Sequence, residues 1–257
     1  MITKNIIYIV LAILLFSCQP PQPEKKSTIT PKKNIIILLD LSDRLIVQDE
    51  QPKRDKEIIK SIYGIFEEKV KHDLYIRSRD EIKVVIAPQR GAGLPTYKYE
   101  DKLYINMDNI PRISRKPKEQ ERREIFHGYV DTLYQESVYS SNPKKYYGAD
   151  IWKYIYEDLE HDMSEDTITD NFLFILTDGY PVVGKDTAKL EPVNKTFPDL
   201  EVVLVEVAPR DKDLEMDRIM ELWRQWLDEM EVNSYTFIKR KAITKEIDQI
   251  KEILGAR

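Results

Sequence analysis

Short apolar segments alternate with amphipathic segments along most of the chain. The apolar segments have the length of strands, about four to eight residues, and several lack the polar alternation of a strand exposed on one face. Between them, apolar residues recur at the three- and four-residue spacing of a helix that buries one face. The predicted strands lie at 34–39, 82–86, 102–107, 171–176, 200–207 and 235–238. The predicted helices begin near Pro52, Lys118, Asp150, Met216 and Ile243.

Strands that alternate with helices predict a single α/β domain over residues 34–257. Such a chain forms a mostly parallel sheet, because each helix carries the chain back to the edge from which the next strand begins. We therefore expect a three-layer, doubly wound, Rossmann-like fold with helices on both faces. The third strand follows a turn around Arg90, Gly91 and Gly93, so we expect it to return as an antiparallel edge strand.

The N-terminus predicts export. After Lys4, an apolar run from Ile6 to Phe16 is too short to span a bilayer, which takes about 20 residues, but has the length of a secretory signal. Leu15-Phe16-Ser17-Cys18 follows and resembles the lipobox of bacterial lipoproteins, although Phe16 departs from the small residue usual there. The resemblance implies cleavage after residue 17 and acylation of Cys18, for example with palmitate. Residues 1–17 are thus the expected signal peptide.

Residues 18–33 predict an acylated cysteine and a flexible tether. They are rich in proline and lysine and nearly free of apolar side chains, so they cannot bury enough surface to fold. Fully extended, the segment from Gln19 to Lys33 reaches about 45 Å. Glutamine directly after the cysteine resembles the signal for sorting to the outer rather than the inner membrane. We therefore expect a domain held to a membrane of the cell envelope by a lipid.

Composition limits the possible partners. The formal net charge is −5, and basic and acidic residues are mixed along the chain, whereas nucleic-acid binding requires a basic stripe. Cys18 is the only cysteine, so no disulfide can form within the chain. The three histidines are scattered and lack the spacing of metal ligands.

Two strand ends carry polar residues of interest. The first strand ends in Asp40-Leu41-Ser42-Asp43-Arg44, and the fourth ends in Thr177-Asp178-Gly179. This pair of motifs, in this order, resembles the von Willebrand factor A family over about residues 34–254. In that family the two strands are neighbours at the switch point of the sheet, where open α/β sheets bind ligands. The resemblance implies a metal-ion-dependent adhesion site, with Mg²⁺ or Ca²⁺ held by Asp40, Ser42 and Asp178. The implied surface for a protein partner comprises Arg44, Arg90, Gly91, Gly93, Asp150, Gly179 and Tyr180.

The sequence departs from the family pattern twice. Arg44 stands at the position of a second serine ligand, and Ala149 stands where the family has a threonine. Two interpretations follow. A cation binds with a substitute ligand such as Asp150, or the guanidinium of Arg44 pairs with the carboxylates in place of a cation. Asp150 also precedes a predicted helix and is a candidate for its N-cap.

These features favour a lipid-anchored binding, adhesion or assembly protein without catalytic activity. One alternative is a metal-dependent hydrolase, either a PIN-like nuclease or a phosphatase, that uses the acidic strand ends. Phosphatases of the haloacid dehalogenase type would need an aspartate where Ser42 stands, and no nucleophile–base pair is visible. Another alternative is a structural envelope protein whose ligand site no longer functions.

Overall fold

The computed structural model describes residues 31–89, 95–139, 149–164, 166, 168–181, 190, 193–209 and 212–255, without the side chains of 138–139 and 212–215. The compact unit that the structure describes begins at Pro31. The expected signal peptide, Cys18 and most of the tether therefore lie outside the described residues. The same holds for Arg90, Gly91 and Gly93.

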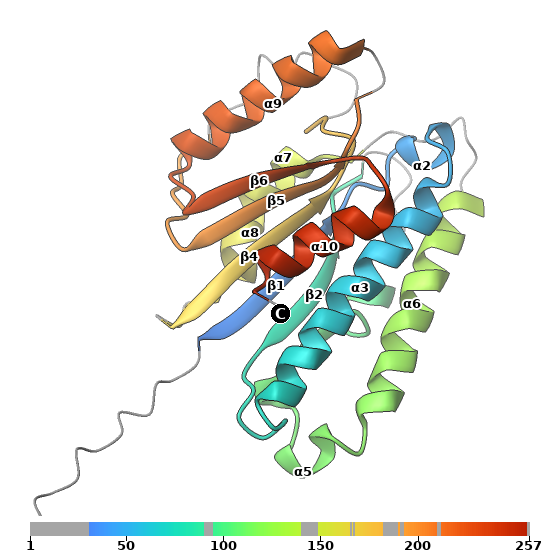
Figure 1. The fold of residues 1–257 in the computed structure, drawn as a ribbon, viewed down its shortest axis with the longest axis vertical. Coiled ribbons are helices and arrows are strands. Elements are labelled where there is room, and N and C mark those ends of the chain that lie inside the picture. Colours follow the sequence, from blue (N-terminus) through green and yellow to red (C-terminus); the bar gives the residue numbers. More distant parts are fainter. Residues whose placement is uncertain are drawn as a thin grey trace, which may run out of the picture. The chain divides into compact units, whose positions relative to one another are not determined.

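A six-stranded sheet forms the centre of the domain (Figure 1). Its order is β3-β2-β1-β4-β5-β6, and only β3 is antiparallel to its neighbour. This is the expected doubly wound α/β fold with one antiparallel edge strand. The strands are β1 (Lys32–Leu39), β2 (Glu81–Ile86), β3 (Tyr104–Asn106), β4 (Thr169–Leu176), β5 (Leu200–Val207) and β6 (Ser234–Lys239).

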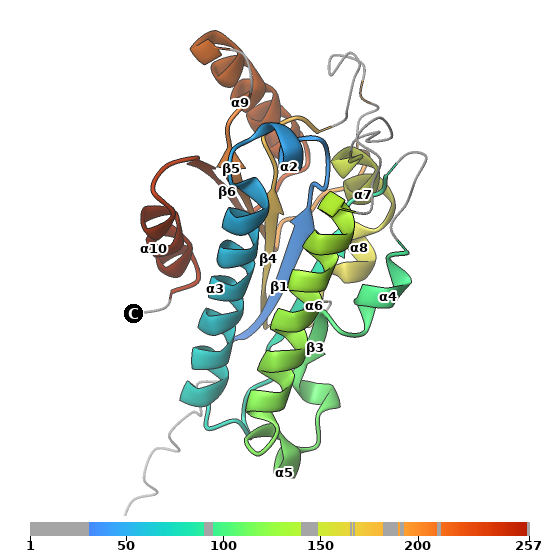
Figure 2. The same ribbon diagram turned by 90° about the vertical axis from the view of Figure 1, so that its right-hand side faces the viewer.

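Helices cover both faces of the sheet. On one face pack α3 (Gln51–His72), α6 (Glu119–Tyr139) and α10 (Ile243–Ile253). On the other face pack α7 (Ile151–Glu157), α8 (Leu159–Asp162) and α9 (Lys212–Glu229). Figure 2 shows α3 and α6 side by side in front of the sheet. Short helical segments lie in the connections: α2 (Arg44–Val47), α4 (Tyr97–Glu100), η1 (Met107–Asn109) and α5 (Arg112–Arg115).

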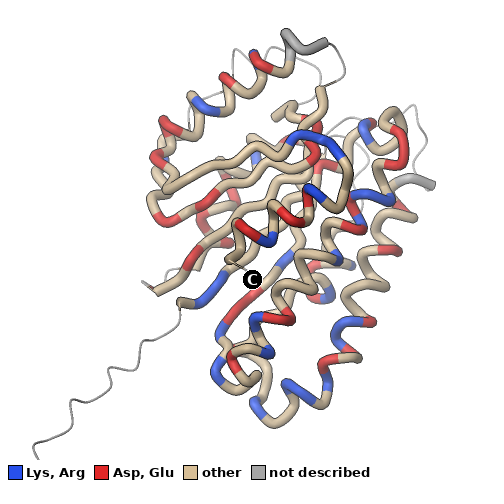
Figure 3. The backbone as a smooth tube through the Cα atoms, in the orientation of Figure 1, with Lys and Arg blue, Asp and Glu red and all other residues tan. Residues whose placement is uncertain are grey.

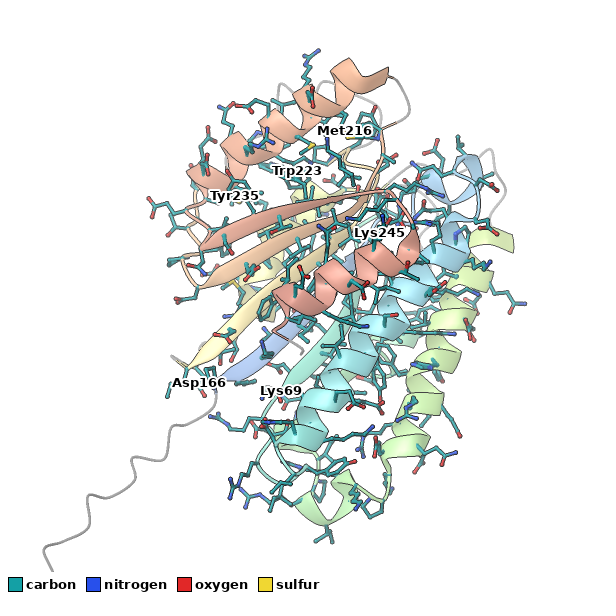
Figure 4. All side chains as sticks on the ribbon, in the orientation of Figure 1. Lys69, Asp166, Met216, Trp223, Tyr235 and Lys245 are labelled. Atoms are coloured by element: carbon teal, nitrogen blue, oxygen red, sulfur yellow. The ribbon has the colours of Figure 1, made fainter. Side chains whose placement is uncertain are left out.

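Alternation along β1 shows why the chain folds this way. Ile35, Ile37 and Leu39 join the core beneath α3 and α6, whereas Ile36 and Leu38 join the core beneath α7 and α9. Successive side chains of a strand point to opposite faces, so a wholly apolar strand requires cover on both. Trp223 of α9, labelled in Figure 4, is fully buried in the second core.

The structure corrects the expected start of the domain. Lys32 and Lys33 belong to β1 rather than to the tether. The Lys32 ammonium lies 2.7 Å from a carboxylate oxygen of Glu81, and the Lys33 ammonium lies over the ring of Phe172. Lysine stems can pack along apolar surface while the ammonium finds a partner, so two lysines do not prevent strand formation.

Among the described residues, no helix has the length and apolar content needed to cross a bilayer.

Candidate functional site

Four segments meet at the edge where the parallel strands end, and we call them together the carboxyl rim. They are the loop after β1 (40–44), the loop after β2 (87–89), the start of α7 (149–152) and the loop after β4 (177–181). The Gln89 side chain donates to the Leu41 carbonyl (3.0 Å), and Gln89 pairs with Ala149 through a β-bridge. The backbone N–H of Ile151 donates to the Pro181 carbonyl (3.0 Å). Three of these loops follow strands in the middle of the sheet.

Asp40 joins the first and last of these loops. Its strand neighbour Leu39 is in register with Leu176, so the two loops leave the sheet side by side. One carboxylate oxygen of Asp40 accepts from the Ser42 backbone N–H (3.0 Å), and the other accepts from the Thr177 hydroxyl (2.9 Å). Asp40 and Ser42 are both buried. The Asp-x-Ser motif therefore forms a turn that its own side chains stabilise.

Gly179 explains the shape of the loop after β4. Its φ of 112° is open to glycine but strained for other residues, and a Cβ there would meet Ile219 and Val207 at 3.2 and 3.3 Å. The indole N–H of Trp223 donates to the Gly179 carbonyl (2.7 Å), so helix α9 holds the loop in place. The Thr-Asp-Gly motif is thus held in place by the contact between Gly179 and Trp223 of α9.

The side chain of Arg44 lies beneath the loops of the carboxyl rim. Its side chain is fully buried and therefore takes no part in the surface that a partner would contact. The guanidinium donates to the backbone carbonyls of Asp40 (2.8 Å) and Leu176 (3.0 Å), at the ends of β1 and β4. It binds Asp55 of α3 with two hydrogen bonds, of 2.6 and 3.3 Å. Its Nε lies 3.7 Å from a carboxylate oxygen of Asp40. Arginine suits this position because its planar fork can bind several acceptors at once.

Asp55 is the main partner of Arg44 and is itself fully buried. The Gln51 side chain (2.7 Å) and the Tyr134 hydroxyl (2.9 Å) also donate to its carboxylate. Burial raises the pKa of Asp55, while the charge and hydrogen bonds of Arg44 oppose that effect. Burial alone would lower the pKa of Arg44, but the carboxylates of Asp55 and Asp40 raise it above its usual value. We interpret the pair as ionised at neutral pH, with every charge partnered.

The other predicted rim residues have local partners. The Asp150 carboxylate accepts from the Lys153 backbone N–H (2.9 Å) at the first turn of α7, which confirms an N-cap role. The Asp178 carboxylate accepts from the backbone N–H of Tyr180 (3.3 Å) and is buried. Tyr180 packs partly buried against the core beneath α7 and α9. Gly179 and Tyr180 lie in the loop after β4, whose Thr177 hydroxyl binds the Asp40 carboxylate.

The oxygen donors at the rim do not fit a complete cation site. Calcium takes about six to eight oxygen ligands, and magnesium also requires a regular oxygen shell. Here Ala149 supplies a methyl group, and a guanidinium lies close to the Asp40 carboxylate. Both oxygens of that carboxylate already accept hydrogen bonds from the loops. Across the described residues, no group of three histidine, cysteine, aspartate or glutamate side chains is placed to hold a metal ion.

The ion pair of Arg44 continues into a longer buried network. Gln51, which donates to Asp55, accepts a hydrogen bond from Arg240, the residue after β6. Arg240 lies 3.5 Å from Glu206 of β5. Among the described residues, the network has four carboxyl groups, those of Asp40, Asp55, Glu206 and Glu246, and three guanidinium groups, those of Arg44, Arg54 and Arg240. Among these groups, the carboxyl groups outnumber the guanidinium groups by one.

Glu206 and Glu246 meet at Arg54. Both side chains are fully buried and both are bound by Arg54, at 2.6 and 2.8 Å. Within the described part of the chain, one oxygen of each carboxyl group has no hydrogen-bond partner. Burial, followed by the neighbouring carboxyl group of Glu206, raises the pKa of Glu246 to about 7. Glu206 also has a left-handed backbone, with φ of 68°, at an irregularity in β5.

Comparison with known proteins gives the chain no family name. No family model matches the chain, and neither does any curated protein. Two solved structures are similar, each over 88% of this chain with a TM-score of 0.41. One is an aerotolerance-related membrane protein from Bacteroides fragilis, at 13% identity and covered completely. The other is proximal thread matrix protein 1 from the mussel byssus, at 12% identity, of which 48% is covered.

Proposed function

We propose that this protein is a lipid-anchored component of a bacterial cell envelope that binds another protein at its carboxyl rim. The domain would be of the von Willebrand factor A type, and Arg44 would take the place of the cation. The observation that carries the proposal is the pairing of the Asp40 and Thr177–Asp178 loops at the switch point of the sheet, where such folds bind ligands. Arg44 joins the same two loops from below through the carbonyls of Asp40 and Leu176.

Exposed apolar side chains beside these loops support a protein partner. Helix α2 follows the Asp40 loop directly and exposes Ile46 by 46% and Val47 by 58%. Protein interfaces combine an apolar core with a polar rim, so exposed apolar residues next to polar loops suit such a contact. A hydrolase would instead require several acids free to hold a metal. Of the acids at the rim, Asp150 caps α7 and Asp40 holds two loop groups.

The proposed interface can be tested by capture from detergent-solubilised envelopes with the full chain as bait. We expect Val47→Asp to reduce recovery of the partner at least tenfold, because a charge would be buried in the contact. Ile125→Asp is the matched control, since Ile125 is 39% exposed on α6 and lies outside the carboxyl rim. Equal recovery with both variants would contradict binding at the rim and favour a structural protein with a nonfunctional site.

The lipid anchor has a separate test. Metabolic labelling with a fatty acid should mark the natural chain, and Cys18→Ala should abolish the label because no other cysteine can accept it. The same variant should also retain its first 17 residues, which mass measurement of the purified protein would show. Ser17→Ala keeps a small residue before the cysteine and is the control. Equal labelling of the natural chain and Cys18→Ala would remove the lipoprotein proposal.

A further inference from the structure

Three large apolar side chains are exposed at the end of the domain where the parallel strands begin, opposite the carboxyl rim. Leu74 and Ile76, in the loop after α3, are 62% and 51% exposed, and Ile113 of α5 is 87% exposed. We call these three residues the apolar tip. Figure 1 shows the end of α3 and α5 together at the lower end of the fold, and Lys69 marks that end of α3 in Figure 4. Clustered exposed apolar residues usually mark a binding surface.

The exposure of these residues is built into the structure. The buried guanidinium of Arg115 donates to the carbonyls of Tyr75 (2.9 Å), Ile76 (3.3 Å) and Ser78 (2.8 Å). Leu74 and Tyr75 have left-handed backbones, with φ of 55° and 59°. Non-glycine residues adopt that conformation only where their surroundings impose it. Arg115 therefore fixes the loop to α5 and holds Leu74 and Ile76 outward.

Basic residues surround the apolar tip. Figure 3 shows lysine and arginine positions gathered along the loop after α3 and along α5. The exposed ones are Arg77, Arg79, Arg112, Lys116 and Lys118. Three acids in the same region are already paired: Asp73 with Lys69, Glu119 with Lys71 and Arg123, and Asp108 with Arg79. An apolar centre within a basic ring complements an anionic lipid surface.

The chain enters the domain at this same edge. The Lys33 backbone N–H donates to Asp80 (2.8 Å), and the other carboxylate oxygen of Asp80 accepts from the Ser78 hydroxyl (2.8 Å). Ser78 is also one of the residues held by Arg115. The start of β1, the loop after α3 and α5 therefore form one hydrogen-bonded unit. The thirteen residues between Cys18 and β1 would span about 20 Å as a coil and about 40 Å if extended.

We propose that the apolar tip and its basic ring dock onto the surface of the membrane that holds the lipid anchor. This inference rests on the anchor in the proposed function. A tether of this length keeps the tip at an effective concentration in the millimolar range near the bilayer, so weak contacts suffice for docking. The carboxyl rim, at the other end of the parallel strands, would then face away from the membrane, where a partner can reach it.

Helix α3 allows a matched test, because it runs from the carboxyl ends of the parallel strands to the ends where they begin. The acylated full chain carries a fluorophore on His72→Cys or on Lys53→Cys, whose native side chains are 84% and 71% exposed near opposite ends of the helix. Acylation leaves the natural cysteine unreactive toward the label. The probe membrane is a vesicle of phosphatidylethanolamine and phosphatidylglycerol with a spin-labelled lipid as quencher. We expect quenching at His72 to exceed quenching at Lys53 several-fold.

The triple variant Leu74→Asn, Ile76→Asp and Ile113→Asp should abolish this difference while the chain stays on the vesicles. Asparagine is chosen at position 74 because it tolerates a left-handed backbone. Val47→Asp, at the opposite edge, should keep the difference. Equal quenching at both positions of the natural chain, or a difference that survives the triple variant, would overturn docking and leave the anchor standing. Release of the natural chain from the vesicles would contradict both the proposed lipid anchor and the proposed docking.

Discussion

Replacing Arg44 with methionine should lower the melting temperature of the domain by about 10 °C. The change leaves Asp55 charged and buried, and it removes hydrogen bonds to the ends of β1 and β4. Loss of one partner from a buried ion pair costs about 3–5 kcal/mol. In a domain of this size each kcal/mol corresponds to about 2–4 °C. Thermal unfolding followed by circular dichroism measures the shift.

Two further variants separate the ion pair from the loss of packing. Lys53→Met removes a cation whose side chain is 71% exposed, and should change the melting temperature by no more than about 4 °C, since exposed pairs contribute about 0–1 kcal/mol. Arg44→Met combined with Asp55→Leu removes both buried charges and should recover much of the stability lost by Arg44→Met. If the double variant were less stable than Arg44→Met, the unpaired charge of Asp55 would not be the cause of the lost stability.

Glu246→Gln should change how the stability of the domain depends on pH. In the folded protein the pKa of Glu246 is raised to about 7 by burial and by Glu206, whereas in the unfolded chain it should lie near 4.3. The folded state therefore binds more protons between these values. The stabilisation that this proton provides is fully present below pH of about 4.3 and is lost as pH rises through about 7.

Glutamine imitates the protonated acid at every pH and keeps the acceptor for Arg54 and for the Lys241 backbone N–H. Between pH 5 and 8, Glu246→Gln should therefore gain stability relative to the natural protein, by up to about 3 kcal/mol. Comparing the two proteins cancels the contributions of other groups, such as His127, whose pKa is lowered by burial. Urea unfolding at several pH values measures the difference. Identical pH dependence in both would show that Glu246 holds no shared proton.

The hydrophobic pattern predicted most of the fold because apolar periodicity depends on local sequence. The run at 200–207 matches β5, and the helix predicted from Lys118 to Tyr139 matches α6 from Glu119. The short helices α2, α4 and α5 were missed, since four residues are too few to show a helical period. Tyr97 and Tyr99, which precede the third predicted strand, lie in α4.

The candidate site was predicted less completely, because ion pairs depend on contacts between distant segments. The motifs placed Asp40 and Asp178 at neighbouring strand ends, but nothing near Arg44 identifies Asp55 as its partner. A signal was nevertheless present. Asp55 lies on the apolar stripe of α3, three and four residues before Ile58 and Ile59, and Glu246 occupies a similar position in α10. A charged residue on an apolar stripe indicates a buried, paired charge.

The most direct test of the central claim is a calorimetric titration of the full chain with Mg²⁺ and with Ca²⁺. If Arg44 takes the place of a cation, the natural protein should give no binding heat at millimolar concentrations. The variant with Arg44→Ser, Asp55→Asn and Ala149→Thr restores two oxygen ligands without leaving Asp55 charged, and should bind. If the natural protein did hold a cation, a hundredfold excess of the ion over its dissociation constant would stabilise it by about 2.7 kcal/mol. Binding heat in the natural protein that Asp178→Ala abolishes would contradict the account.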